Sequence, residues 1–165
     1  MPNYRRHYLP VPVFVTIVTH DRRPWLLAEA DTVLAAMRRV KAHRPYRHLA
    51  HVLLPDHLHW LFAPAEPTDL SRIVAAVKRE VSWRLKARGV RGPLWQDRFY
   101  DHLIRDADDF RRHLDYIHYN PVRHGLVDEA GDYAHSSFAA WRQRGVYASD
   151  WGRAEPEGVR GMDLE

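Results

Sequence analysis

The sequence predicts an α+β fold, in which an antiparallel sheet carries helices mainly on one face and a C-terminal extension follows. Strand-like runs rich in β-branched residues alternate with runs of helical periodicity. Two of the strand patterns are joined by a short Pro55-Asp56 link, which indicates a hairpin. The resulting order, β-α-β-β-α-β-α, is typical of a split βαβ, ferredoxin-like sandwich.

Each element is recognised by its own residue pattern and by the residues that interrupt it. In chain order we expect a strand over about 13–20, a helix over 29–42, strands over 47–54 and 57–63, a helix over 69–88, a strand over 100–105 and a helix over 106–119. Pro12 delays the start of the first strand, and Pro121 disfavours helical geometry at Asn120, so the last helix should end there. The strand over 57–63 is central in this topology, which would hold its side chains on rigid backbone.

The chain is long enough for one well-buried core and too short for two typical domains, at 165 residues. We find no internal repeat and no interdomain linker. We therefore assign residues 1–130 to one domain and residues 131–165 to a C-terminal extension. The Gly- and Glu-rich end of that extension, after Trp151, predicts a flexible tail.

Composition points to a protein that handles polyanions inside the cell. Residues 1–127 hold 21 Lys and Arg against 13 Asp and Glu, a balance of +8, whereas residues 128–165 hold 4 against 8, a balance of −4. A basic body suggests nucleic acid as the partner, although an Arg-rich soluble protein has the same composition. Cysteine is absent, which excludes disulfides and thiolate metal sites. No apolar run could cross a bilayer, and no signal peptide precedes the first strand, so we expect a cytoplasmic location and no membrane partner.

The central strand carries His57 and His59, two histidines one residue apart. Side chains at i and i+2 of a strand point to the same face, so the two imidazoles should stand side by side. Such a pair can supply half of a metal site. Most His-x-His pairs are incidental, however, and this chain has 12 histidines. The pair needs support from elsewhere in the sequence.

That support comes from the last helix, where Tyr116 and Asn120 lie one turn apart beside the apolar stripe. Tyr116 should lie at the edge of the packed face, where a phenol can face a groove, although an ordinary half-buried aromatic fits the helix as well. Asn120 offers an amide oxygen as a third ligand. Two imidazoles and one amide oxygen suit Mg²⁺ or Mn²⁺ better than a closed zinc site. Tyr119 is a rival nucleophile, but the helical phase directs it toward solvent.

Three blocks of the sequence resemble the REP-associated tyrosine transposases, a family of single-tyrosine HUH transposases from bacterial insertion sequences. His57-Leu58-His59 resembles the HUH motif of two histidines around a hydrophobic residue. The blocks that begin at Trp95 (WQDRFYDHLIR) and at Asp115 (DYIHYNPVRHGLV) resemble the family's hallmark blocks. The resemblance extends to Tyr4-Arg-Arg-His-Tyr and to segments of 136–152, and so spans nearly the whole chain.

The resemblance implies an enzyme that cleaves and transfers single-stranded DNA folded as REP-like hairpins. It implies His57, His59 and Asn120 as metal ligands, Mg²⁺ or Mn²⁺ as the ion, and Tyr116 as the nucleophile that forms a 5′-phosphotyrosine. Residues 1–130 would be the catalytic domain of a nucleoid-associated protein, for which we expect a monomer rather than a homodimer. DNA phosphates would be bound by arginines, for which the candidates are Arg5, Arg6, Arg22, Arg23, Arg79, Arg98 and Arg123.

Two other functions remain open at this point. A non-catalytic module could bind hairpin DNA or RNA on a ferredoxin-like sheet, but it would need no His-x-His pair and tyrosine in register. A metal-dependent phosphohydrolase that uses water would cleave without Tyr116. Only the transposase hypothesis predicts a covalent protein–DNA intermediate, so detection of that intermediate distinguishes it from the other two.

Overall fold

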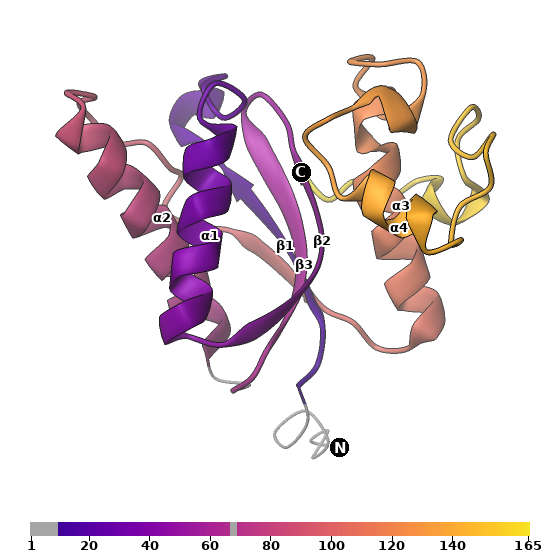
Figure 1. Ribbon diagram of the computed structural model, residues 1–165, viewed down its shortest axis with the longest axis horizontal. Helices are drawn as coiled ribbons and strands as arrows, with labels where there is room; N and C mark the ends of the chain where they lie inside the picture. Colours follow the sequence, from indigo (N-terminus) through magenta and orange to yellow (C-terminus); the bar gives the residue numbers. More distant parts are fainter. Residues whose placement is uncertain (1–9, 67–68) are drawn as a thin grey trace.

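The computed structural model describes residues 10–66 and 69–165, which form the α+β fold expected from the sequence (Figure 1). The elements, in chain order, are β1 (Val13–Val18), η2 (His20–Arg22), α1 (Ala30–His43), β2 (Tyr46–Leu53), β3 (His57–Pro64), α2 (Leu70–Ala87), β4 (Tyr100–Leu103), α3 (Ala107–Arg123), η4 (Ala130–Asp132), α4 (Phe138–Gln143) and η5 (Glu157–Val159). The expected order of strands and helices is confirmed, and most boundaries lie within one or two residues of their predicted positions. None of the helices in the described ranges is long and apolar enough to cross a membrane.

The four strands form one antiparallel sheet in the order β2-β3-β1-β4. This order is that of the ferredoxin-like sandwich, and it places β3 in the interior of the sheet as predicted. In β1, Thr16 lies directly opposite His59, and Val18 lies opposite His57. The outer edge of β2 is covered by the extension, where the Leu53 amide donates a hydrogen bond to the His135 carbonyl oxygen. Because β3 lies between β2 and β1, the backbone that carries His57 and His59 has a neighbouring strand on each side.

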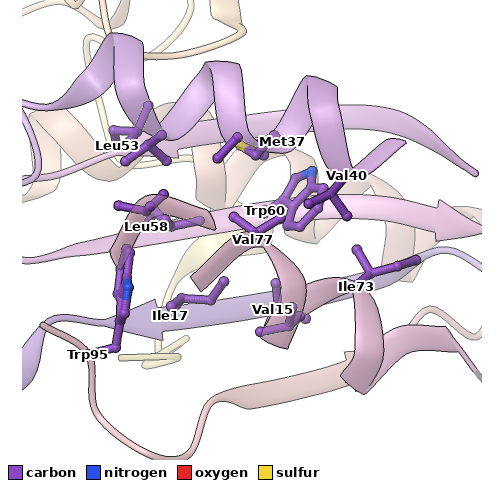
Figure 2. Packing of buried hydrophobic residues seen from close by; sticks show 14 of the residues in the cluster. Val15, Ile17, Met37, Val40, Leu53, Leu58, Trp60, Ile73, Val77 and Trp95 are labelled. Carbon is purple, nitrogen blue, oxygen red and sulfur yellow. The ribbon is translucent and has the colours of Figure 1, made fainter. Parts of the chain in front are cut away.

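Alternation along the strands divides the core into two clusters, one on each face of the sheet. Val15, Ile17, Leu58 and Trp60 face α1 and α2, where they pack with residues such as Val77 (Figure 2). Residues of the opposite parity, such as Phe14 and Leu61, pack with residues of α3 and of the C-terminal extension. These two segments cover that face of the sheet (Figure 1). The histidines of β3 have this second parity. They consequently point between the sheet and α3.

Helix α3 begins with a side-chain cap, because the Asp106 carboxylate accepts a hydrogen bond from the Asp109 amide. It does not end at Asn120 as predicted but continues through Pro121 to Arg123. Proline removes one hydrogen bond from a helix, yet Pro121 is buried, and the His124 amide still bonds the Asn120 carbonyl oxygen. The local preference against helix is thus overridden by packing. The additional turn carries Arg123 and His124 to the same end of the helix as Asn120.

The C-terminal extension packs against α3 and differs from the flexible tail that its composition predicts. Phe138, Tyr147 and Val159 are buried in the second cluster, and Met162 is buried with them. The chain then enters the space between the sheet and α3, where its last residues contact β1 and α3 (Figure 1). Polar and apolar residues are mixed along the extension, so the sequence does not indicate that it packs against the sheet and α3. Each contact is made by a single apolar side chain or backbone group and not by a periodic stripe.

Candidate active site

Strand β3 and helix α3 bring together the four residues that the sequence singles out. The ring centroids of His57 and His59 are 4.9 Å apart, and that of Tyr116 lies 5.2 Å from the His59 ring. Asn120 follows Tyr116 by one helical turn. All four are buried, with exposed fractions of 2% for His57 and 0% for His59, Tyr116 and Asn120. The two histidines stand side by side because a strand repeats every second residue.

Hydrogen bonds fix the orientation of both imidazoles. His57 Nδ1 lies 2.7 Å from the Asp56 carboxylate, which can only accept a hydrogen bond when it is ionised. His59 Nδ1 lies 2.8 Å from Thr16 Oγ1, and that hydroxyl donates its own proton to the Leu164 carbonyl oxygen at 2.6 Å. Thr16 must therefore accept from His59. Both rings carry their proton on Nδ1 and present the Nε2 lone pair, which is the arrangement of metal-bound histidines whose other nitrogen is held by a neighbouring group.

The atoms expected to bind a metal are the ones that lack partners. Among the described residues, the buried side-chain atoms without a hydrogen bond are His57 Nε2, His59 Nε2 and both amide atoms of Asn120. Burial lowers the pKa of His59 well below its usual value, and it lowers that of His57 against the opposing effect of Asp56, so both rings are neutral. Unsatisfied buried polar groups are rare and cost free energy. This donor set fits a divalent ion, with the amide oxygen favouring a hard one such as Mg²⁺ or Mn²⁺.

The unsatisfied amide leads to a stability prediction. We expect Asn120→Leu to raise the free energy of unfolding of the metal-free protein by about 1 kcal/mol, because it removes two buried polar groups that have no partner. His118, on the same helix and also buried, is the matched control, since both of its ring nitrogens are bonded, to Tyr147 Oη and Ser137 Oγ. His118→Leu should therefore lower the free energy of unfolding by about 1–3 kcal/mol. Urea unfolding in EDTA measures both, and destabilisation by both variants to the same extent would contradict the metal-site interpretation.

Tyr116 does not lie at an open groove, as its helical position suggests, but is fully covered. The Leu164 amide donates a hydrogen bond to its hydroxyl at 3.2 Å. Burial raises the pKa of Tyr116, while the Leu164 amide lowers it. The phenol is therefore protonated at neutral pH. Tyr119, predicted to face solvent, is partly buried against the second core cluster.

Two of the arginines proposed for DNA contact lie beside this site. The Arg123 guanidinium lies 5.5 Å from the centre of the Tyr116 ring and donates a hydrogen bond to the Met162 carbonyl oxygen. The Arg22 guanidinium lies 3.3 Å from the Asp56 carboxylate that orients His57. Both residues are largely exposed, and each sits where a phosphate close to Tyr116 would meet positive charge.

The remaining arginine candidates are more scattered. Arg23 is exposed in the loop after β1, and Arg98 is exposed in the loop that leads into β4. Arg79 lines a groove of about 380 Å³ between α1 and α2, on the face of the sheet opposite Tyr116. Arg5 and Arg6 lie outside the described residues. The structure thus brings Arg22 and Arg123 to the site and separates Arg79 from it.

Sequence reasoning missed four residues of the site. Asp56 and Thr16 orient the histidines, while His124 and Glu165 lie next to His57. Asp56 adjoins the motif, and His124 follows Tyr116 by eight residues, which is the same helical face, so both carried a local signal. Thr16 follows only from the strand register. Glu165 had no signal, because its position depends on how the extension packs.

Comparison with known proteins bears directly on this site. The family described as "Transposase IS200 like" matches residues 11–120. The REP-associated tyrosine transposase of Escherichia coli K12 is 36% identical over 154 residues, which cover 92% of this chain and 91% of that protein. A putative REP-associated tyrosine transposase of Haemophilus influenzae is 35% identical over 165 residues, with coverages of 92% and 94%.

Solved structures agree with these sequence relatives. A REP-associated tyrosine transposase bound to a REP hairpin matches with a TM-score of 0.80 and 32% identity, covering 100% of this chain and 99% of that one. A putative transposase from Deinococcus radiodurans matches with a TM-score of 0.51 and 19% identity over 67% of this chain and 90% of its own, which supports the fold alone. Since the matches span almost the entire chain, the protein belongs to the IS200-like transposase family and, within it, to the REP-associated tyrosine transposases.

Proposed function

We propose that this protein is a metal-dependent endonuclease and strand transferase that acts on single-stranded DNA hairpins through a phosphotyrosine on Tyr116. The observation that carries the proposal is the set of unpaired Nε2 atoms of His57 and His59 with the unpaired Asn120 amide, next to a buried tyrosine. A module that only binds DNA has no use for such a set. Tyr116 supplies the nucleophile, and the three other residues supply ligands.

In the proposed reaction, Tyr116 Oη attacks the scissile phosphorus and the bond from phosphorus to the 3′ oxygen breaks. The products are a 5′-phosphotyrosine and a free 3′-hydroxyl, which takes up a proton. A divalent ion held by His57, His59 and Asn120 would polarise the phosphate and offset the charge that grows on its oxygens. Attack by the same or another 3′-hydroxyl reverses the step, so that strands are joined without a separate energy source.

The protonated state of Tyr116 sets a requirement for this chemistry. Its pKa is raised by burial, so the hydroxyl must lose its proton as the bond to phosphorus forms. The Arg123 cation over the ring lowers the pKa of the phenol and would stabilise the developing phenolate. Arg123 therefore has two proposed roles, which are to assist the nucleophile and to contact the DNA phosphate.

The substrate class follows from the relative that is bound to a REP hairpin, which is 32% identical over the whole of this chain. We infer that this protein also binds hairpins of that kind, with Arg22, Arg23, Arg98 and Arg123 as the described candidates for phosphate contacts. Because residues 131–165 cover the second face of the sheet with side chains from the same chain, we propose that the protein acts as a monomer.

The test is the formation of a covalent adduct. Purified protein is incubated with labelled single-stranded DNA that carries a REP-like hairpin, in Mn²⁺, Mg²⁺ or EDTA, and is then separated on a denaturing protein gel. We expect label that migrates with the protein in the presence of metal, is absent in EDTA, and is released by protease. Cleaved DNA without any adduct would instead identify a hydrolase that uses water, and binding without cleavage in either metal would identify a non-catalytic module.

A further inference from the structure

A second group of potential ligands lies at the edge of the proposed metal centre. The ligand atoms of His57, His124 and Glu165 all lie within 4.8 Å of one another. His124 Nε2 is 2.6 Å from Glu165 Oε1, and His57 Nε2 is 3.8 Å from the same oxygen. His57 comes from β3, His124 follows α3, and Glu165 ends the described chain. Three distant parts of the sequence thus converge on a space of a few ångströms.

Hydrogen bonding within the group leaves one of its atoms unsatisfied. His124 can donate to the Glu165 carboxylate, so that pair is complete. His57 Nε2 is buried, holds a lone pair and has no partner, and a separation of 3.8 Å is too long for a hydrogen bond. A tetrahedral ion at about 2.1 Å from each ligand would hold the three atoms about 3.4 Å from one another, so His124 Nε2 and Glu165 Oε1 would separate slightly and His57 Nε2 would approach, each by less than about 1 Å. An ion would satisfy all three residues, whereas the ion pair satisfies two.

We propose that His57, His124 and Glu165 form a second cation site, distinct from the set of His57, His59 and Asn120, that exists only while residues 162–165 are docked. Two imidazoles and one carboxylate are a ligand set suited to Zn²⁺. The two sets share His57 Nε2, so an ion in one excludes an ion in the other. The regulatory role of this second site rests on the proposed function. Zinc binding to the site can be measured whether or not that function is correct.

The position of Glu165 couples this second site to the covering of Tyr116. Leu164, the residue before Glu165, donates to the Tyr116 hydroxyl and accepts from Thr16. An ion bound to Glu165 therefore stabilises the same conformation that covers the nucleophile. By linkage, docking of residues 162–165 must strengthen zinc binding by the same factor by which zinc strengthens docking.

The experiment compares zinc affinity in the wild-type chain with that of Glu165→Gln and His124→Gln, by competition with a chromophoric chelator. We expect each substitution to weaken Zn²⁺ binding at least tenfold, because each removes one of three ligands. Glu157→Gln, an exposed glutamate of the same extension, is the matched control and should bind Zn²⁺ like the wild type. Circular dichroism checks that each variant is folded, as expected for side chains that are 19% and 33% exposed at positions 165 and 124.

A second readout follows the chain itself. We expect Zn²⁺ to slow amide hydrogen exchange at residues 162–165 in the wild type and to leave it unchanged in Glu165→Gln. Zinc that does not slow exchange at residues 162–165 of the wild type, or that slows it equally in Glu165→Gln, would overturn the inference even if zinc binds elsewhere on the protein.

Mn²⁺ binding by His59→Gln is the separate test of the proposed catalytic centre. Unchanged Mn²⁺ affinity in that variant would count against the catalytic set alone. Weaker zinc binding by Glu165→Gln would still support the second site in that case, so the two failures are distinguishable.

Discussion

Tyr116→Phe is expected to abolish the covalent DNA adduct, with a loss of at least about 10⁴-fold, because phenylalanine has no oxygen to attack phosphorus. The variant should fold, since the ring stays in place against Phe14 and His59, and only the hydrogen bond from the Leu164 amide is lost. That bond accounts for about 1 kcal/mol at most. Adduct formation on labelled hairpin DNA in Mn²⁺ measures the effect.

Tyr119→Phe is the matched control for this substitution. It removes the same atom from the same helix, three residues further on, and leaves the ring in the second core cluster. We expect it to form the adduct at the wild-type rate. If the adduct forms in Tyr116→Phe and is lost in Tyr119→Phe, the nucleophile is Tyr119 and the proposal is wrong. If the adduct is lost only when both tyrosines are replaced, either phenol can react.

The fold was predictable because its signals are local and repeated. Each strand and helix carries its own periodicity, and the single short link before His57 selects the hairpin that places β3 inside the sheet. The pairing of His57 and His59 follows from the two-residue repeat of a strand, and that of Tyr116 and Asn120 from the turn of a helix. These are relationships between near neighbours in sequence. Pattern therefore predicts each pair, whereas the assignment of both pairs to one site came from the resemblance to a known family.

What could not be predicted depends on contacts between distant segments. The C-terminal extension has no regular apolar pattern, so neither the burial of Val159 nor the approach of Leu164 to Tyr116 is visible in the sequence. Pro121 gives a local signal that tertiary packing overrides, because its ring is buried and the remaining hydrogen bonds of the turn are kept. Because α3 continues past Pro121, His124 is also brought to the site. Sequence reasoning thus found the candidate ligands and nucleophile but missed the segment that covers them.

Removal of residues 163–165 is expected to increase the rate of adduct formation by about 10–100-fold, measured in Mn²⁺ with zinc excluded. In the structure Tyr116 and His59 are both 0% exposed, so DNA cannot reach them until this segment moves. The segment is held by hydrogen bonds of Leu164 with Tyr116 and Thr16 and by the pair of Glu165 with His124. At about 0.5–1 kcal/mol each, these three bonds together favour the docked conformation by about 1.5–3 kcal/mol, which is a docked population about ten- to a hundredfold above the open one.

The truncation is chosen so that Val159 and Met162 remain, because both are buried and anchor the extension to the second core cluster. Asp163→Ala is the matched control, since Asp163 is exposed within the same segment, and it should react at the wild-type rate. A truncated protein that is folded but no faster than wild type would mean that docking does not limit access to Tyr116. If the truncated chain reacts faster and Tyr116→Phe abolishes that reaction, the same phenol is the nucleophile. Docking of residues 163–165 over Tyr116, and not the chemical step, would then limit the rate of adduct formation in the intact protein.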